Sequence, residues 1–220
     1  LKSIYKYWCY FMIVLPEKNL EFEYENGFYL TCEVSRIGKF IAHYELYKSI
    51  DHLSGAIVEC GVYKGVSLTR FAMFRNLFEK QIKRKIVAFD TFDTFPKTQF
   101  EEDIPLRQNF IDESGDQSIG KSQLLEILNE KNCGESLDLI SGDICETVPE
   151  FVSNNPDLKI ALLNLDVDIY EPSVVILEYL FPLLVKGGIL ILDDYGTFPG
   201  ESQAVDDYFK GQSIEIRKFS

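Results

Sequence analysis

The chain has 220 residues, of which 46% are hydrophobic and 26% are charged, and its formal net charge is −13 at pH 7. So large a negative surplus disfavours a nucleic-acid backbone or an anionic membrane surface as a partner. The five cysteines form no C-x-x-C pair, which argues against a disulfide framework or a zinc site. With no targeting or membrane-spanning segment recognised, we expect a cytoplasmic protein.

Residues 1–54 are expected to form an N-terminal helical segment that serves as a lid or as an oligomerisation surface. The aromatic stretch at 5–15 carries no chemical motif, and exposed apolar surface of this kind is typical of subunit contacts. We therefore expect a homo-oligomer. Over 31–54, apolar side chains recur at roughly helical spacing, which predicts an amphipathic helix.

From residue 55 onward, short apolar runs alternate with helical patterns. The expected strands are 56–61, 85–90, 137–143, 159–166, 187–194 and 213–219. The expected helices are 67–81, 121–132, 147–154, 172–185 and 202–211. This alternation predicts one α/β domain over 55–220, a Rossmann-like, doubly wound and mostly parallel sheet. The long polar stretch at 97–120 is expected to be a functional loop or a mobile lid, with its acid-rich run 100–105 solvated.

Four aspartates follow two of the expected strands. Asp166 and Asp168 end the run IALLNLDVD, and Asp193 and Asp194 end GGILILDD. The carboxyl ends of parallel strands meet at one edge of a sheet, where ligands bind. Buried carboxylates are costly unless something pairs with them, and no Lys or Arg follows nearby in the sequence. Because a cation would supply the missing charge, the pattern predicts a metal or catalytic site.

The segment VECGVYKGVS (58–67) ends the first expected strand and opens a helix. Its glycines, Gly61 and Gly65, allow a sharp turn and a close approach to a ligand. Asp90 ends the next strand, where an acid binds a ribose hydroxyl in nucleotide-binding folds. Glu59 stands at the first glycine position of the dinucleotide fingerprint and would repel a pyrophosphate. An adenosine ligand with an amino-acid moiety, S-adenosylmethionine, fits better.

Five segments resemble the macrocin O-methyltransferase family in order along the chain. They are VECGVYKGVS, FDTFDTFP, SGDICETVP, LDVDIYEPS and GGILILDDYGTFPGESQAVDDYF. The resemblance implies a class I fold that uses S-adenosylmethionine and Mg²⁺ to methylate hydroxyls of antibiotic sugars. It implies that the cofactor is held by Glu59, Gly61, Tyr63, Gly65, Ser67, Asp90, Thr91, Gly142 and Asp143. It also implies that Mg²⁺ is held by Asp166, Asp193 and Asp194.

Methyl transfer from a sulfonium is an in-line displacement and needs a nucleophilic oxygen. A sugar hydroxyl has a very high pKa, so a metal ion and a neighbouring carboxylate are expected to assist loss of its proton. We assign the role of base to Asp168, while an exchange of roles with Asp166 stays open. A catechol-like phenol or a polysaccharide sugar is an alternative acceptor. Two alternatives belong to other functional classes. One is a nicotinamide-dependent oxidoreductase, which Glu59 disfavours, and the other is a non-catalytic binding protein.

Overall fold

A five-stranded parallel sheet forms the centre of the protein. The computed structural model describes residues 13–79 and 84–219. The sheet has the order β3-β2-β1-β4-β5, and each neighbouring pair of strands is parallel. The strands are β1 (Ala56–Cys60), β2 (Ile86–Asp90), β3 (Leu137–Ser141), β4 (Ile160–Leu165) and β5 (Leu184–Leu192). The predicted doubly wound α/β fold is confirmed.

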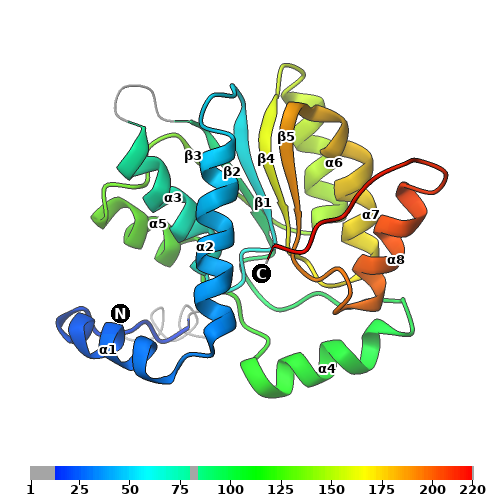
Figure 1. Cartoon of the computed structure of the whole chain (residues 1–220). Coiled ribbons are helices and arrows are strands. Elements are labelled where there is room, and N and C mark those ends of the chain that lie inside the picture. The colour runs from blue at the N-terminus through cyan, green and yellow to red at the C-terminus, as the bar shows by residue number, and fades with distance from the viewer. Residues whose placement is uncertain (1–12, 80–83, 220) are drawn as a thin grey trace, which may run out of the picture.

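Helices cover both faces of this sheet (Figure 1). One face carries α2 (Val34–Ser49), α3 (Val66–Phe78) and α5 (Lys121–Glu130). The other face carries α6 (Ile144–Asn154), α7 (Tyr170–Tyr179) and α8 (Pro199–Tyr208). The described residues also form two short 3₁₀ turns, η1 (Lys18–Leu20) and η2 (Phe181–Leu183). No described helix is both long enough and apolar enough to span a membrane.

The apolar strands form because each one contributes side chains to the hydrophobic core on both faces of the sheet. In β4 every residue is buried, and successive side chains point to opposite faces. Leu162 packs into the cluster beneath α3, whereas Leu163 packs into the cluster beneath α7. Burying a leucine contributes about 1.5–3 kcal/mol, so the inner strands are held firmly and present fixed carboxyl ends.

The stretch predicted as a long loop, 97–120, contains a helix. This helix, α4 (Asp103–Ser114), crosses the carboxyl edge of the sheet (Figure 1). The expectation that 100–105 is solvated is wrong for Asp103, which is fully buried. Its carboxylate accepts hydrogen bonds from the amides of Tyr170 (3.0 Å) and Gly200 (2.7 Å). An acid in a polar run is buried here because backbone amides at two helix starts solvate it.

The described part of the N-terminal region, from residue 13 onward, contains two α-helices where one was predicted over 31–54. The first, α1 (Glu21–Thr31), buries no side chain and exposes apolar residues such as Phe22 and Leu30. The second, α2, buries His43 and Tyr47 against the domain. Part of the aromatic stretch at 5–15 lies outside the described residues. The boundary between 1–54 and 55–220 and the homo-oligomer stay predictions.

The strand predicted at 213–219 is wrong. This segment forms no described strand, and Ile214 and Ile216 are 46% and 43% exposed. Alternating apolar residues form a strand only when a neighbouring strand accepts their backbone hydrogen bonds. Within the described ranges the sheet ends at β5, and this segment does not pair with it.

Candidate active site

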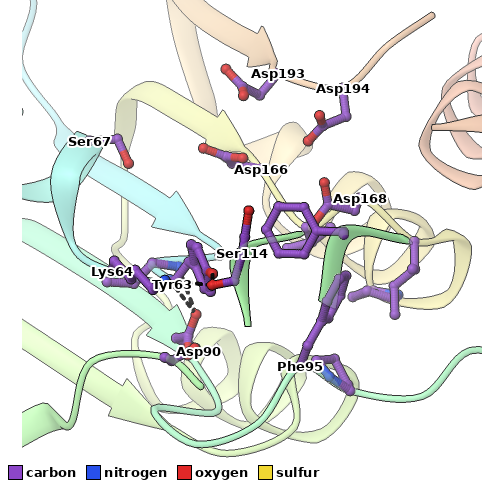
Figure 2. A pocket seen from close by; sticks show the side chains of 18 of the residues that line it. Tyr63, Lys64, Ser67, Asp90, Phe95, Ser114, Asp166, Asp168, Asp193 and Asp194 are labelled. Atoms are coloured by element: carbon purple, nitrogen blue, oxygen red, sulfur yellow. Dashed lines mark hydrogen bonds between the residues drawn. The ribbon is translucent and has the colours of Figure 1, made fainter. Parts of the chain in front are cut away.

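A cavity of about 990 Å³ lies at the carboxyl edge of the sheet. The loops that follow β1, β2, β4 and β5 all contribute to its lining, as do residues of α2 and α4. Figure 2 shows two groups of side chains in it. Four carboxylates gather on one side, and Tyr63, Lys64 and Asp90 lie on the other. Open parallel sheets bind ligands at this edge, so the position of the cavity agrees with the fold.

Three of the carboxylates are close enough to share one ion. Asp166 follows β4, whereas Asp193 and Asp194 follow β5, the neighbouring strand. One oxygen from each lies within 4.8 Å of the other two. The ends are held in register because the Asp193 amide donates to the Leu165 carbonyl over 3.0 Å. Three hard oxygen donors in this arrangement suit Mg²⁺ or a similar cation.

Burial and mutual repulsion disturb the ionisation of Asp166 and Asp194. Burial, followed by the charge of Asp193, raises the pKa of Asp166 well above its usual range. Burial, followed by the charge of Asp168, raises the pKa of Asp194 to about 9. A bound cation would reverse both effects, because it stabilises the ionised form of each group.

A lysine distant in sequence reaches the same cluster. Lys39, on α2, places its ammonium Nζ 2.6 Å from Asp193 Oδ2. Burial lowers the pKa of Lys39, but the charges of Asp166 and Asp193 together raise it above its ordinary value. The expectation that no basic residue follows nearby holds along the chain, yet the fold brings one in from 154 positions away.

Asp168 lies beside the three carboxylates in an uncommon backbone conformation. Its φ is +65°, in the left-handed region that aspartate tolerates better than most side chains. Burial raises its pKa to about 7, although a hydrogen bond with Asp194 opposes this change. A carboxylate that titrates near neutral pH is suited to accept a proton.

Glu201, on α8, contacts the backbone of one member of the cluster, Asp194. It is fully buried, and its Oε1 accepts a hydrogen bond from the Asp194 amide over 3.0 Å. Burial, followed by the charge of Asp194, raises the pKa of Glu201 to about 9. Its proton lets the side chain lie close to Asp194 without adding another negative charge.

Asp90 organises the other side of the cavity. Its Oδ2 accepts hydrogen bonds from the amides of Val62 (2.8 Å) and Tyr63 (3.0 Å), in the loop after β1. Its Oδ1 accepts from the amide of Phe92 over 2.6 Å. The Tyr63 hydroxyl donates to the Ser114 carbonyl over 2.6 Å, which ties the same loop to the end of α4. One carboxylate therefore fixes two loops that border the cavity.

Only glycine fits at position 61, because the neighbouring backbone leaves no room for a side chain. Its φ is +90°, and a Cβ added there would lie 1.6 Å from the Asp166 carbonyl oxygen. The Asp166 amide also donates to the Cys60 carbonyl over 3.0 Å. The end of β1 therefore lies against the end of β4, which brings the glycine loop next to the acid cluster.

Glu59 lies beneath the cavity. It is fully buried in β1, opposite Asn164 of β4, and Ser67 donates to its Oε1 over 2.8 Å. Burial raises the pKa of Glu59 to about 8. Glu59 does not border the cavity, whereas its hydrogen-bond partner Ser67 does.

The structure brings ten of the thirteen predicted site residues to the cavity wall. The lining includes Gly61, Tyr63, Ser67, Asp90, Thr91, Asp143, Asp166, Asp168, Asp193 and Asp194. Glu59, Gly65 and Gly142 do not border it. Asp143 caps α6 by accepting a hydrogen bond from the Cys145 amide over 2.8 Å. Lys39, Asp103 and Glu201 were not singled out. Lys39 and Asp103 act across long separations in sequence, whereas Glu201 lies only seven positions after its partner Asp194.

Comparisons with known proteins show a family and a fold shared with O-methyltransferases. The family model for macrocin O-methyltransferase (TylF) matches residues 42–217. A calicheamicin methyltransferase, CalS11, superposes with a TM-score of 0.74 at 27% identity, covering 91% of this chain and 82% of CalS11. The O-methyltransferase NovP superposes with a TM-score of 0.71 at 20% identity, over 83% of this chain and 76% of NovP, which shows a shared fold.

A curated relative comes from Streptomyces olivaceus, the 8-demethyl-8-(2,3-dimethoxy-alpha-L-rhamnosyl)-tetracenomycin-C 4'-O-methyltransferase. It is 28% identical over an alignment of 163 residues, which covers 72% of this chain. The chain spans 59% of the length of this relative.

Proposed function

The chain belongs to the macrocin O-methyltransferase family, and we propose that it transfers a methyl group from S-adenosylmethionine to a hydroxyl of a sugar or a sugar-bearing small molecule. Asp166, Asp193 and Asp194 hold a divalent cation, Mg²⁺, in this proposal, and Asp168 is the base. The observation that carries the proposal is the common cavity. The acid cluster and the loops fixed by Asp90 border the same space at the carboxyl edge of the sheet.

The donor set suits a hard divalent cation. Asp166, Asp193 and Asp194 offer only carboxylate oxygens, which Mg²⁺ prefers. Asp194 Oδ2 is buried without a hydrogen-bond partner among the described residues. A buried oxygen of this kind is costly, and a cation would satisfy it.

The side of the cavity that contains Asp90 suits an adenosine ligand with an amino-acid moiety. Asp90 and Thr91 border the cavity after β2, where a ribose is expected, and Asp143 borders it after β3. Gly61 and Ser67 border it next to the acid cluster. An extended ligand lying along the strand ends would therefore bring its far end to the carboxylates.

When bound, S-adenosylmethionine supplies the methyl carbon and Mg²⁺ supplies positive charge that eases loss of the acceptor proton. The chain contributes position and a proton acceptor. Asp168, with a pKa of about 7, takes the proton, and buried Glu201 holds the Asp194 backbone in place. Helix α4 and residues of α2 line the cavity from outside the sheet.

The printed names of two relatives support a sugar as the acceptor. A second CalS11 structure, 28% identical with a TM-score of 0.65, is described as a TDP-rhamnose 3'-O-methyltransferase. The curated relative is described as a 4'-O-methyltransferase of a rhamnosyl tetracenomycin. Both descriptions place the methyl group on a deoxysugar hydroxyl, and we infer the same class of acceptor here.

Thermal stability tests this proposal without knowledge of the acceptor. A ligand that binds the native state raises the unfolding midpoint. We expect S-adenosylhomocysteine to raise it and Mg²⁺ to add a further shift. NADH serves as the control for an oxidoreductase. A shift with NADH and none with S-adenosylhomocysteine would overturn the proposal. Transfer of a labelled methyl group to a panel of deoxysugars and catechols then identifies the acceptor class.

A further inference from the structure

The ammonium of Lys39 lies inside the carboxylate cluster. Its Nζ is 2.6 Å from Asp193 Oδ2, and the side chains of the pair are 33% and 18% exposed. Asp193 is also one of the three acids whose oxygens lie within 4.8 Å of one another. One of the three proposed metal ligands is thus already paired with a positive charge.

We propose that Lys39 is an internal counter-ion that competes with the divalent cation for Asp193, so that metal binding requires its ammonium to leave. This inference rests on the proposed function, because it takes the three aspartates as the metal site. It adds a residue, carried by α2 and outside the acidic motifs, that sets the affinity of the site.

The Lys39 ammonium and a divalent cation cannot both occupy the position next to Asp193, for reasons of space and of charge. Mg²⁺ binds carboxylate oxygens at about 2.0–2.1 Å, so an ion on Asp193 Oδ2 would lie close to the present Nζ position. A divalent ion and an ammonium this close repel each other strongly in a partly buried site. Lys39 must therefore move away from Asp193 when the ion binds, and the cost of that movement weakens the measured affinity.

The position of Lys39 on α2 shows where the ammonium can go. Arg36, one turn earlier, and Glu33 also line the cavity, so this face of the helix forms part of its wall. Deeper along α2, His43 accepts a hydrogen bond from Arg70, whose Nη1 is 3.1 Å from His43 Nδ1. The positive charge of Arg70 repels a second cation near His43. The displaced ammonium is therefore expected to turn into the cavity.

Binding of Mn²⁺, measured by electron paramagnetic resonance without donor or acceptor, tests the inference. The variants are Lys39→Met, which removes the charge, Lys39→Arg, which keeps it, and Asp193→Asn, which removes the ligand. Lys48→Met is the matched control, because Lys48 lies on the same helix but pairs with Asp51 at the surface. We expect Lys39→Met to bind Mn²⁺ about tenfold more tightly than the natural protein, a change of about 1.4 kcal/mol.

A second readout uses stability. Without metal, Lys39→Met should unfold at a lower temperature than the natural protein, because three carboxylates then lack their counter-ion. Saturating Mn²⁺ should stabilise the variant more than it stabilises the natural protein. If Lys39→Met does not fold, Lys39→Gln replaces it in both measurements.

The outcomes separate this inference from the proposed function. Equal Mn²⁺ affinity in the natural protein and Lys39→Met would overturn the role of Lys39 and leave the metal site standing. Tighter binding by Lys48→Met as well would also overturn it, because the effect would then be one of net charge. Binding of S-adenosylhomocysteine without Mn²⁺ binding in any variant would overturn both the metal site and this inference. Tighter binding in Lys39→Met alone, lost on adding Asp193→Asn, would support it.

Discussion

The carboxylate of Asp103 lies directly against the backbone of Gly200. The Gly200 amide donates to Asp103 Oδ1 over 2.7 Å, and a Cβ added at Gly200 would lie 1.9 Å from Asp103 Oδ2. The other oxygen accepts from the Tyr170 amide at the start of α7. A single acid on α4 thus fixes the starts of α7 and α8, the helices that follow Asp168 and Asp194.

Gly200→Ala is expected to destabilise the protein by about 1–3 kcal/mol, the usual cost of forcing an atom into a packed site. Urea denaturation measures the change. Gly27→Ala is the control, since no atom lies within 4 Å of a Cβ at that helical position. That control should be neutral or stabilising by up to about 1 kcal/mol. Equal stability of the two variants would contradict the role of the Asp103 contact.

Asp193→Asn should separate the metal from the cofactor. Loss of one charged ligand is expected to weaken Mn²⁺ binding by about 100-fold or more, because an amide oxygen carries no net charge. The affinity for S-adenosylhomocysteine should stay within about twofold. Isothermal titration measures both ligands. Asp157→Asn, at an exposed loop position, is the control and should change neither.

Asp90→Asn should give the opposite result. The amide that replaces the carboxylate keeps one accepting oxygen, whereas its NH₂ cannot accept. The variant therefore loses either the bonds from Val62 and Tyr63 or the bond from Phe92, and one of the two loops loses its anchor. We expect S-adenosylhomocysteine to bind at least about tenfold more weakly and Mn²⁺ binding to stay unchanged. A parallel loss of both ligands would indicate that the variant disturbs the whole edge of the sheet.

Asp168→Asn tests the assignment of the base. The base must be ionised, so the rate should fall as the pH drops through the pKa of Asp168, about 7 without metal and lower once a cation is bound. The variant should lose this dependence, and kcat should fall by about 10²–10⁴. The pH–rate profile is measured with the acceptor found in the methyl-transfer panel. A profile that keeps its shape in the variant transfers the role to Asp166.

The metal-free protein should lose stability as the pH rises from 6.5 to 8. In the fold the pKa of Glu59 is about 8, and those of Asp194 and Glu201 are about 9. Unfolding returns each group to a pKa near 4, so the native state binds more protons than the unfolded state in this window. Stability then decreases with rising pH.

Thermal unfolding at several pH values measures this slope. Glu201→Gln should reduce the slope, and saturating Mg²⁺ should reduce it further by stabilising ionised Asp194. Below pH 6.5 His43 opposes the trend, because its pKa is lowered to about 4 and its contribution to stability falls as the pH drops. A midpoint independent of pH between 6.5 and 8 would contradict the raised pKa values.

The sheet and the four aspartates could be predicted from local patterns. Apolar runs that end in Asp166 and Asp193 identify two buried strands and the edge where they stop. These features depend on neighbours in sequence, and hydrophobic periodicity reports such neighbours well. The five strands of the sheet were therefore expected in the correct order along the chain.

The failures involve contacts between distant segments. Lys39 pairs with Asp193 across 154 positions, and Asp103 with Gly200 across 97, so neither pair leaves a local pattern. The segment 213–219 has the alternation of a strand but no neighbouring strand that pairs with it. In each case the structure of the segment depends on contacts with residues far away in the sequence. Such tertiary contacts can override local propensity.

The close packing of Gly61 against Asp166 has a consequence for how this protein can diversify. Because a Cβ at Gly61 would lie 1.6 Å from the Asp166 carbonyl, the ends of β1 and β4 behave as one rigid frame. Neither end can be rebuilt for a new substrate without displacing the other. The parts of α1, α2 and α4 that reach the cavity lie outside this frame. Under the proposed function, remodelling of those helices can therefore change the preferred acceptor while the site at the strand ends stays fixed.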